Sequence, residues 1–345
     1  MEKIFINTQG SGSEIIVGAN WESVAGLLPE KGVIIVTDEN VSHIYGDRLP
    51  KVPTLTISPG EGSKNLEVIE NLAFQLLEAG IDRYGFILAV GGGVVCDIAG
   101  FLASIYMRGI RCGYVSTTLL SQVDASTGGK NGVNLGGTKN MLGNIRQPEF
   151  VICDPGMLRT LPEEEYLSGL AELIKTAVIG DYELFEIVEQ RYEEIMARDY
   201  DLLTLLIAKS VKFKASVVTE DEKEAGLRRI LNFGHTLGHA VELHKSVKHG
   251  FAVATGIEFA TDFSFEKGVI SNGEKVRIIK LLERFDLLVK HNIEADQIEN
   301  LILHDKKRIG NNIHFVFTEG IGRAVVKQVN VKEVMDHYKL FVGKR

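Results

Sequence analysis

The chain has 345 residues, more than one ordinary hydrophobic core accommodates, and this length predicts two domains. Its hydrophobic content of 45% and charged content of 24% are typical of a globular protein in water. The net charge of −8 argues against general binding to nucleic acid or to anionic membranes, because both need a basic surface.

The sequence contains no run of 18 apolar residues and no basic leader followed by an apolar stretch. We therefore expect neither a membrane span nor a secretory signal. The three cysteines, Cys96, Cys112 and Cys153, lack metal-type spacing and are predicted to be reduced thiols of a cytoplasmic protein.

Up to about residue 155, short apolar runs alternate with helical stretches. The runs that predict buried strands are residues 32–37, 55–58, 86–90, 113–117 and 150–153. Residues 65–79 carry apolar side chains at helical spacing, and Gly80 marks the end of that helix. This alternation favours a parallel sheet with helices on both faces, so residues 1–155 are predicted to form an α/β domain.

The second part of the chain has mostly helical patterns. Helices are predicted over residues 163–179, 184–197, 202–218, 231–243, 256–265, 275–285 and 295–303. Strand signals are sparse there and concentrate in residues 313–317. Residues 156–345 are therefore predicted to form a mostly α-helical domain.

Three consecutive glycines, Gly91, Gly92 and Gly93, follow the predicted strand 86–90 and precede a helical stretch. Glycine lets a backbone approach a ligand closely, and the N–H groups at a helix start hold phosphates. Because the run is not the G-x-G-x-x-G fingerprint, a tight turn without a ligand remains the alternative. Asp38 and Asn40, together with the polar loop 59–64, offer further ligand positions at the carboxyl ends of parallel strands.

Residues 121–146 carry six glycines, three cations and one anion in an otherwise acidic protein. We predict a long irregular loop whose lysines and amide groups bind a phosphate or a carboxylate. A solvated loop without a function is the alternative, although a loop of this length without a role is uncommon.

Four of the nine histidines fall between residues 235 and 249, and imidazole is the commonest protein ligand for transition metals. Spacing alone favours His235 and His239, which lie four residues apart on one helical face. His249, just beyond that predicted helix, is a third candidate, and Glu172 offers a carboxylate on an apolar helix face. Two alternatives stay open: a plain ion pair between Glu172 and Lys175, and a structural histidine cluster without a metal.

Several characteristic runs occur together in one order. They include GGGVVCD at 91–97, STTLLSQVD at 116–124, GLAELIK at 169–175 and NFGHTLGH at 232–239. Shorter runs lie at 106–109, 128–130, 139–140, 147–148, 160–162 and 304–307. Over about residues 38–310 the chain therefore resembles the 3-dehydroquinate synthases, sugar-phosphate cyclases of the shikimate pathway.

The resemblance implies a Rossmann-like NAD-binding domain followed by a helical metal-binding domain, with the site in the cleft between them. It implies that Zn2+ or Co2+ is held by Glu172, His235 and His249, so that His239 faces the substrate instead of the metal. The NAD contacts that it implies are Asp38, Asn40, Glu61, Lys64, Gly92, Gly93, Asp97, Thr117, Thr118, Lys139, Thr160 and Leu161.

The implied reaction converts 3-deoxy-D-arabino-heptulosonate 7-phosphate, an anionic sugar acid, to 3-dehydroquinate and phosphate. Transient oxidation by NAD is followed by β-elimination, reduction and intramolecular aldol closure. The matching substrate-site positions are Arg108, Asp124, Lys130, Asn140, Lys175, Lys214, Arg228, Asn232, His239 and Lys306.

Individual roles follow from the charges of the implied substrate. Lys130, Asn140 and Arg108 are expected at the phosphate, with Arg108 acting across the interface of a homodimer. Lys214 and Arg228 are expected at the carboxylate. His239 is expected to relay a proton.

Three positions depart from the family pattern, namely Pro59, Asn131 and Phe251. The rival functions are another sugar-phosphate cyclase, a metal-dependent polyol dehydrogenase, and an inactive homologue that acts by binding. Net consumption of NAD+ indicates the dehydrogenase, whereas phosphate release with catalytic NAD indicates a cyclase.

Overall fold

A computed structural model describes residues 1–8, 12–136, 138–245, 247–290, 293–303 and 308–343. The chain forms two compact units, Met1–Leu161 with Arg198–Glu222, and Pro162–Ala197 with Lys223–Arg345. The predicted helical domain 156–345 is therefore not one unit, because Arg198–Glu222 packs with the first unit. Its helix α7 (Tyr200–Glu220) contacts β1 (Glu2–Asn7) and β2 (Gly12–Val17). Apolar spacing predicts that α7 has a buried face, but spacing does not indicate which core buries that face.

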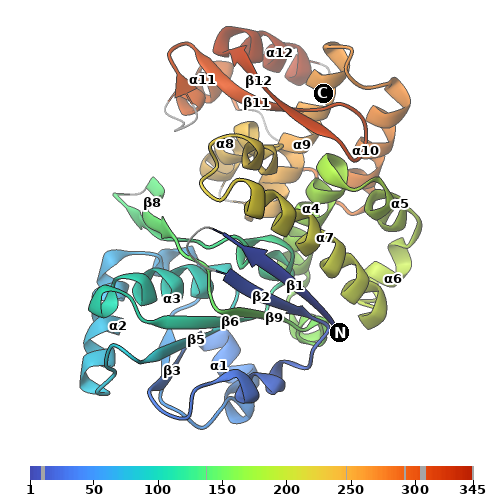
Figure 1. Cartoon of the computed structure of the whole chain (residues 1–345). Coiled ribbons are helices and arrows are strands. Elements are labelled where there is room, and N and C mark those ends of the chain that lie inside the picture. Colours follow the sequence, from blue (N-terminus) through green and yellow to red (C-terminus); the bar gives the residue numbers. More distant parts are fainter. Residues whose placement is uncertain (9–11, 137, 246, 291–292, 304–307, 344–345) are drawn as a thin grey trace. The chain divides into compact units, whose positions relative to one another are not determined.

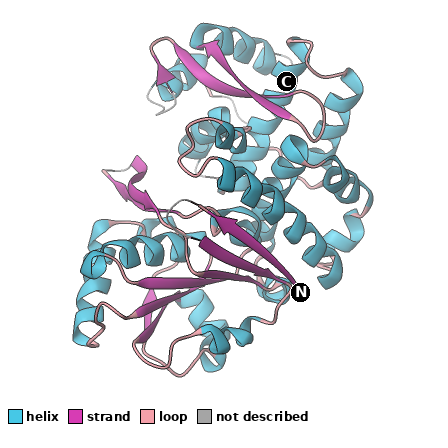
Figure 2. Ribbon diagram, viewed as in Figure 1, coloured by secondary structure: helices cyan, strands magenta, loops and turns pink. Residues whose placement is uncertain are grey.

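The first unit contains a seven-stranded sheet in the order β1-β2-β9-β6-β5-β3-β4 (Figures 1 and 2). The strands besides β1 and β2 are β3 (Val33–Asp38), β4 (Thr54–Ile57), β5 (Phe86–Gly91), β6 (Arg111–Ser116) and β9 (Phe150–Cys153). Neighbouring strands are parallel except β1 and β2, which are antiparallel. The predicted parallel α/β sheet is therefore confirmed, although β1 and β2 were not predicted.

Both faces of this sheet are covered. Ile35 and Leu88 point to one face and share a core with Tyr45 of α1 (Glu39–Tyr45). Ile34 and Ile87, which alternate with them, are fully buried on the opposite face, where α3 (Gly93–Ile105) packs against β5. The remaining helices and helical turns of this part are α2 (Leu66–Glu78), η1 (Trp21–Leu27), η2 (Gly46–Arg48), η3 (Glu61–Ser63), η4 (Tyr106–Arg108), η5 (Ser121–Ala125) and η6 (Pro155–Thr160).

Residues 121–146 differ from the predicted irregular loop. They form η5, a short π-helix, followed by an antiparallel hairpin of β7 (Lys130–Leu135) and β8 (Thr138–Ile145). Two glycines explain the difference: Gly132 pairs with Gly143, and a Cβ on Gly132 would lie 2.6 Å from the carbonyl oxygen of Leu142. Glycine therefore permits a close strand approach here, although its abundance suggested a loop.

The second unit is mostly helical, and its described strands form one small sheet (Figure 2). The helices are α4 (Glu163–Gly180), α5 (Tyr182–Gln190), α6 (Tyr192–Met196), η7 (Leu227–Asn232), α8 (His235–Lys245), α9 (His249–Glu266), α10 (Asn272–Arg284), α11 (Ala295–Leu303) and α12 (Val331–Gly343). The antiparallel strands are β10 (Arg308–Ile309), β11 (Asn312–Thr318) and β12 (Ala324–Asn330).

Helix boundaries differ from the predictions at three places. The predicted helix 184–197 is divided at Arg191, whose backbone is not helical. The predicted helix 231–243 starts only at His235, because Gly234 adopts a left-handed φ of 78°. His249 lies just after α8, as expected, but the predicted helix 256–265 begins earlier, at His249 itself, as α9.

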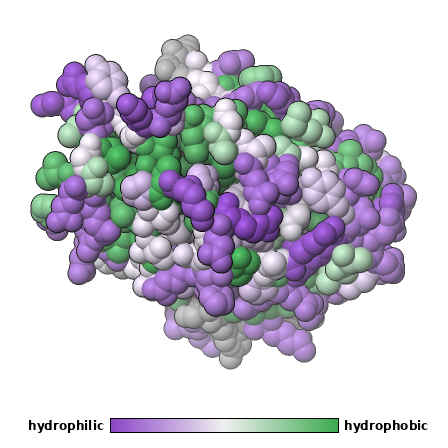
Figure 3. Space-filling view, turned by 90° about the horizontal axis from the view of Figure 1, so that it is seen from below, coloured by the Kyte–Doolittle hydropathy of each residue, from purple (hydrophilic) through white to green (hydrophobic). Residues whose placement is uncertain are grey.

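The surface is mixed in polarity. On the face drawn in Figure 3, apolar residues gather in places among hydrophilic ones. Among the described residues, no helix has both the length and the apolar character needed to cross a membrane.

Candidate functional site

The topology of the sheet identifies one edge as a ligand-binding position. The connection from β3 to β4 runs to one side of β3, whereas β5 and β6 lie on the other side. The winding direction therefore reverses between β3 and β5. Open α/β sheets bind ligands beyond the carboxyl ends of the strands at such a reversal. Asp38 ends β3 and Gly91 ends β5 at this point.

The predicted cofactor residues follow the carboxyl ends of neighbouring parallel strands, with one exception. Asp38 ends β3 and Asn40 follows it, whereas Glu61 and Lys64 follow β4. The positions that follow β5, β6 and β9 are Gly92, Gly93, Asp97, Thr117, Thr118, Thr160 and Leu161. Lys139 is the exception because it lies in β8.

The glycine turn leaves the start of α3 open. Gly92 is the N-cap of α3 and contributes no side-chain hydrogen bond to it. A Cβ on Gly92 would lie 2.9 Å from Thr118 Cγ2, and one on Gly93 would lie 3.1 Å from Ala125 Cβ. The glycines thus allow the turn to pack closely, and the N–H groups of the first helical turn suit the pyrophosphate of a dinucleotide.

A buried polar network lies beside this turn. Lys64 is 4% exposed, and its Nζ donates to Asp97 Oδ2 at 2.6 Å and to Asn140 Oδ1 at 2.7 Å. Asn134, which the sequence analysis did not identify, donates to Glu61 Oε1 at 3.0 Å and accepts from the backbone of Asn140 at 2.9 Å. Burial raises the pKa of Asp97 to about 6, although Lys64 opposes the rise. The hairpin is thereby tied to the turn after β4.

Other cofactor candidates also have structural partners. The Asp38 side chain caps α1 by accepting from Val41 N at 2.9 Å, and burial raises the pKa of Asp38. Thr160 Oγ1 lies 2.6 Å from the hydroxyl of Tyr45, which belongs to α1. Asn40 is exposed in the first turn of that helix.

Besides Asn140, the first unit contains four predicted substrate residues, of which two are paired with each other. Lys214 Nζ donates to the carbonyl oxygen of Asp124 at 2.7 Å and forms an ion pair with its carboxylate. Lys130 is exposed at the start of β7. Arg108 is exposed in a turn where Arg108 and Met107 both have positive φ, of 68° and 49°. Backbone strain of this kind is concentrated at functional sites.

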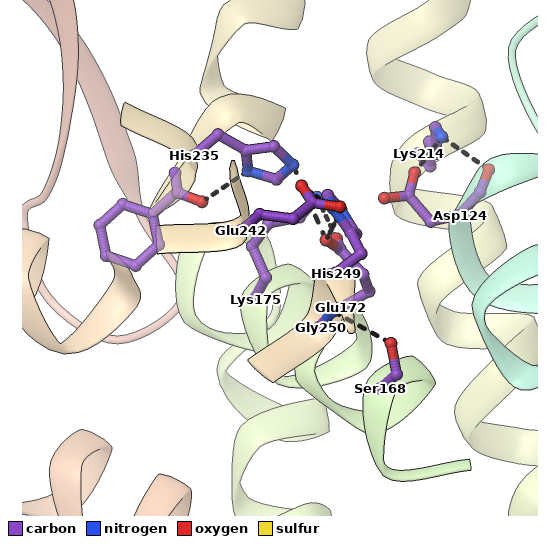
Figure 4. A network of polar contacts seen from close by, with 10 residues as sticks. Asp124, Ser168, Glu172, Lys175, Lys214, His235, Glu242, His249 and Gly250 are labelled. Atoms are coloured by element: carbon purple, nitrogen blue, oxygen red, sulfur yellow. Dashed lines mark hydrogen bonds and ion pairs between the residues drawn. The ribbon is translucent and has the colours of Figure 1, made fainter. Parts of the chain in front are cut away.

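The second unit contains a compact group of three side chains that could hold a metal ion (Figure 4). Glu172 lies in the middle of α4, and its side chain is fully buried. Glu172 Oε1 is 3.2 Å from His249 Nε2 and 3.7 Å from His235 Nε2. One donor atom from each residue lies within 4.8 Å of the others. One carboxylate and two imidazoles form a donor set that suits Zn2+ or Co2+ and leaves coordination positions for a substrate.

Glycines bring the three supporting helices together. A Cβ on Gly250 would lie 2.0 Å from the carbonyl oxygen of Ser168, and one on Gly256 would lie 1.8 Å from that of Gly234. Gly250 N also donates to Ser168 Oγ at 3.0 Å. Helices α4, α8 and α9 can therefore approach one another more closely than any larger residue permits, which places Glu172 beside the two histidines.

In both histidines the outer nitrogen, Nδ1, which is the one that does not face Glu172, lies near a hydrogen-bond acceptor. His235 Nδ1 lies 3.1 Å from the carbonyl oxygen of Phe233, and His249 Nδ1 lies 3.2 Å from Glu242 Oε2. Burial alone would lower the pKa of His249, but hydrogen bonds with Glu172 and Glu242 outweigh burial and raise that pKa to about 10. Lys175 forms an ion pair with Glu172, as the structural alternative anticipated. Glu242 was missed, although it lies two turns from His235 on one helix.

The remaining candidate residues of the second unit are not part of this group of three side chains. The His239 ring lies 5.3 Å from the His235 ring at an interplanar angle of 89°, and His239 is not in the group of metal donors. Asn232 Nδ2 donates to Glu224 Oε1 at 2.5 Å. Arg228, in η7, is 1% exposed. Lys306 lies outside the described residues.

Comparison with known proteins identifies the family. The family model described as 3-dehydroquinate synthase N-terminal matches residues 54–168, and the one described as 3-dehydroquinate synthase C-terminal matches residues 169–308. The chain belongs to the 3-dehydroquinate synthase family. Relatives that are named 3-dehydroquinate synthase, a sugar-phosphate cyclase, are similar to this chain over nearly its whole length.

Two 3-dehydroquinate synthases illustrate the similarity. That of Alkaliphilus metalliredigens is 38% identical over 355 residues, which span 97% of this chain and 96% of that protein. That of Caulobacter vibrioides is 41% identical over 324 residues and 88% of each chain. Among solved structures, 2-epi-5-epi-valiolone synthase from Streptomyces hygroscopicus subsp. jinggangensis, with NAD+ and Zn2+ bound, has a TM-score of 0.89 at 26% identity. That comparison covers 98% of this chain and 99% of the other.

Proposed function

We propose that this chain is a 3-dehydroquinate synthase that converts 3-deoxy-D-arabino-heptulosonate 7-phosphate to 3-dehydroquinate and phosphate. The observation that carries the proposal is the grouping of Glu172, His235 and His249 in a chain that matches this family through residues 54–308. Its cofactors are NAD and Zn2+ or Co2+. These three side chains hold the metal, which when bound supplies the Lewis acidity that lowers the pKa of a substrate hydroxyl.

The first unit binds NAD, which supplies a transient hydride acceptor. Backbone N–H groups at Gly92 and Gly93 bind its pyrophosphate, since no side chain caps α3. Asp38, at the end of the adjacent strand β3, would contact a ribose of the bound cofactor. The ion pair of Lys64 with Asp97 fixes the turn after β4 against α3. The supporting contacts come from Asn40, Glu61, Thr117, Thr118, Lys139, Thr160 and Leu161.

The cationic residues bind the two anionic ends of the substrate. Lys130, Asn140 and Arg108 bind the phosphate, and Lys214 and Arg228 bind the carboxylate. Lys214 pairs with Asp124 in the structure, so binding requires that Lys214 share or exchange this partner. Fixing both ends of a flexible sugar acid in one conformation favours elimination and ring closure.

Proton transfer falls to His239. It lies one helical turn after His235, with its ring almost perpendicular to the ring of that ligand. A histidine in this position suits a proton relay for the substrate hydroxyl, because imidazole can both accept and donate a proton. Asn232, Lys175 and Lys306 complete the proposed substrate site.

We further propose a cytoplasmic homodimer in which Arg108 serves the site of the partner subunit. The strained, exposed turn at Met107 and Arg108 supports this assignment. Sedimentation of wild-type protein tests the assembly. Mixing inactive Arg108→Ala subunits with subunits inactivated at Glu172 would restore part of the activity if Arg108 acts in trans.

The decisive experiment follows phosphate release from the heptulosonate with metal-stripped and zinc-restored protein, and then identifies the product. We expect zinc-dependent release, formation of 3-dehydroquinate and no net consumption of NAD+. A different carbocycle would identify another sugar-phosphate cyclase. Accumulation of NADH would identify a polyol dehydrogenase, and turnover that is independent of metal would refute the proposed site.

A further inference from the structure

The two histidines of the metal-binding group differ in what holds their outer nitrogens. His235 Nδ1 faces a neutral backbone carbonyl, that of Phe233, at 3.1 Å. His249 Nδ1 faces an anionic side chain, that of Glu242, at 3.2 Å. Both rings present Nε2 to the same oxygen of Glu172. The outer contacts therefore fix the same ring orientation in both histidines by different means.

The position of His249 makes an outer contact necessary. It is the first residue of α9, and its side chain is 31% exposed, whereas that of His235 is 12% exposed. A side chain at a helix end with this exposure has more rotational freedom than one within a packed helix. The contact with Glu242 removes that freedom and keeps Nε2 directed at Glu172 (Figure 4).

The placement of Glu242 follows from the sequence of α8. Glu242 lies seven residues after His235, so both project from one face of the helix, two turns apart. The close packing of Gly238 against α9 supports this arrangement, because a Cβ there would lie 3.2 Å from Val253 Cα. The Glu242 side chain is only 12% exposed, and a carboxylate so far removed from water requires a polar partner.

We propose that Glu242 is a positioning residue for the metal site, which orients His249 by accepting a hydrogen bond from its Nδ1–H. This inference rests on the proposed function, since it assigns a role within the proposed metal site. With Nδ1–H donated to Glu242, Nε2 is the nitrogen of His249 that remains to bind a metal beside Glu172. A carboxylate acceptor also makes the imidazole a stronger electron donor, which a neutral carbonyl does to a smaller extent.

The test measures metal binding by the full chain instead of turnover. Metal-stripped wild type, Glu242→Gln and Glu242→Ala are titrated with Co2+, and the visible spectrum reports the coordination geometry. Competition with a chromophoric chelator gives the Zn2+ affinity. We expect Glu242→Ala to bind about 10- to 100-fold more weakly, with an altered Co2+ spectrum. Glu242→Gln should lose less affinity and keep a spectrum close to wild type, because its amide oxygen still accepts from Nδ1–H.

Glu165→Gln is the matched control, since it removes a carboxylate that pairs with Lys248, the residue next to His249, at 2.8 Å. It should bind metal as wild type does. The isosteric Gln variant keeps the test valid if the Ala variant does not fold. Wild-type affinity in either folded Glu242 variant would overturn the inference. Absence of metal binding by the wild type would refute the proposed metal site itself, so the two failures are distinguishable.

Discussion

Lys64 Nζ lies 2.6 Å from Asp97 Oδ2, and this ion pair joins the turn after β4 to the helix after β5. Both groups are largely removed from water, with side-chain exposures of 5% and 21%. The pair therefore connects the segments that follow β4 and β5, the two strands that flank β3 in the sheet, beside the proposed NAD site.

Asp97 gives the stability of the protein a specific pH dependence. Burial raises its pKa from 3.8 to about 6. A carboxyl with a raised pKa stabilises the fold while it is protonated, and this contribution is lost as the pH rises through the folded-state pKa. Two pKa units correspond to about 3 kcal/mol. Relative to Asp97→Asn, the wild type should thus lose stability between about pH 4 and pH 6 and show a constant difference above about pH 7. Denaturant unfolding of both proteins across this range, without NAD, tests the prediction, and a constant difference at every pH would contradict it.

Substitution Glu172→Gln should abolish turnover and weaken metal binding on the order of 100-fold or more. The amide keeps the shape of the side chain but removes the anionic donor, and a direct ligand contributes more than an outer partner does. Metal content after dialysis and the rate of phosphate release measure the effect. Glu165→Gln, on the same helix, is the control and should retain both. Full metal content and a wild-type rate in Glu172→Gln would show that the ligand assignment is wrong.

Gly250→Ala should destabilise the protein by about 3 kcal/mol or more and weaken metal binding. Its Cβ would lie 2.0 Å from a backbone oxygen, so α4 and α9 would have to separate. Gly273→Ala is the control within α10, where a Cβ would lie 3.8 Å from Ser271 Oγ, an ordinary van der Waals contact. That control should be neutral or stabilising by up to about 1 kcal/mol, since alanine favours a helix over glycine. Thermal unfolding distinguishes the two, and equal melting temperatures would exclude the packing argument.

Asn134→Ala should lower stability by about 1–2 kcal/mol and weaken NAD binding. It leaves Glu61 Oε1 and the backbone N–H of Asn140 each without one partner. Gln75→Ala, which removes an exposed amide from α2, should change stability by less than about 0.5 kcal/mol. Thermal unfolding and titration with NAD+ check both. Unchanged NAD affinity in Asn134→Ala would show that NAD binding does not depend on this contact.

The sequence predicted the parts of the fold that periodicity governs. Buried parallel strands such as β3 and β5 are continuous apolar runs, and they are recognisable without a partner. Strand β1 was missed because it lies at an edge and mixes polar with apolar residues, with Phe5 58% exposed. The hairpin was missed because glycine is ordinarily unfavourable in a strand. Gly132 and Gly143 fit in strands here because they pair with each other, and the sequence does not show that pairing.

The candidate metal site shows a similar limit of prediction from sequence patterns. Spacing along one helix favoured His235 with His239, because a sequence pattern registers only residues that share a helix. The group in the structure instead joins three helices, through Glu172, His235 and His249, and only the family resemblance indicated that set. Glu242 lies two turns after His235 on the same helical face, which the sequence shows. The sequence does not show that its side chain contacts His249, which belongs to another helix.

The chain passes between its two units more than once, and this constrains the order in which the protein can fold during synthesis. The chain leaves the first unit after Leu161, re-enters it at Arg198 and leaves it again after Glu222. During synthesis, β1 and β2 therefore cannot be covered by α7 until α4 to α6 of the other unit have been made. A fragment that stops at Leu161 would lack the helix that shields these strands and should aggregate. Gene fusions or exchanges that treat either unit as one uninterrupted block should fail for the same reason.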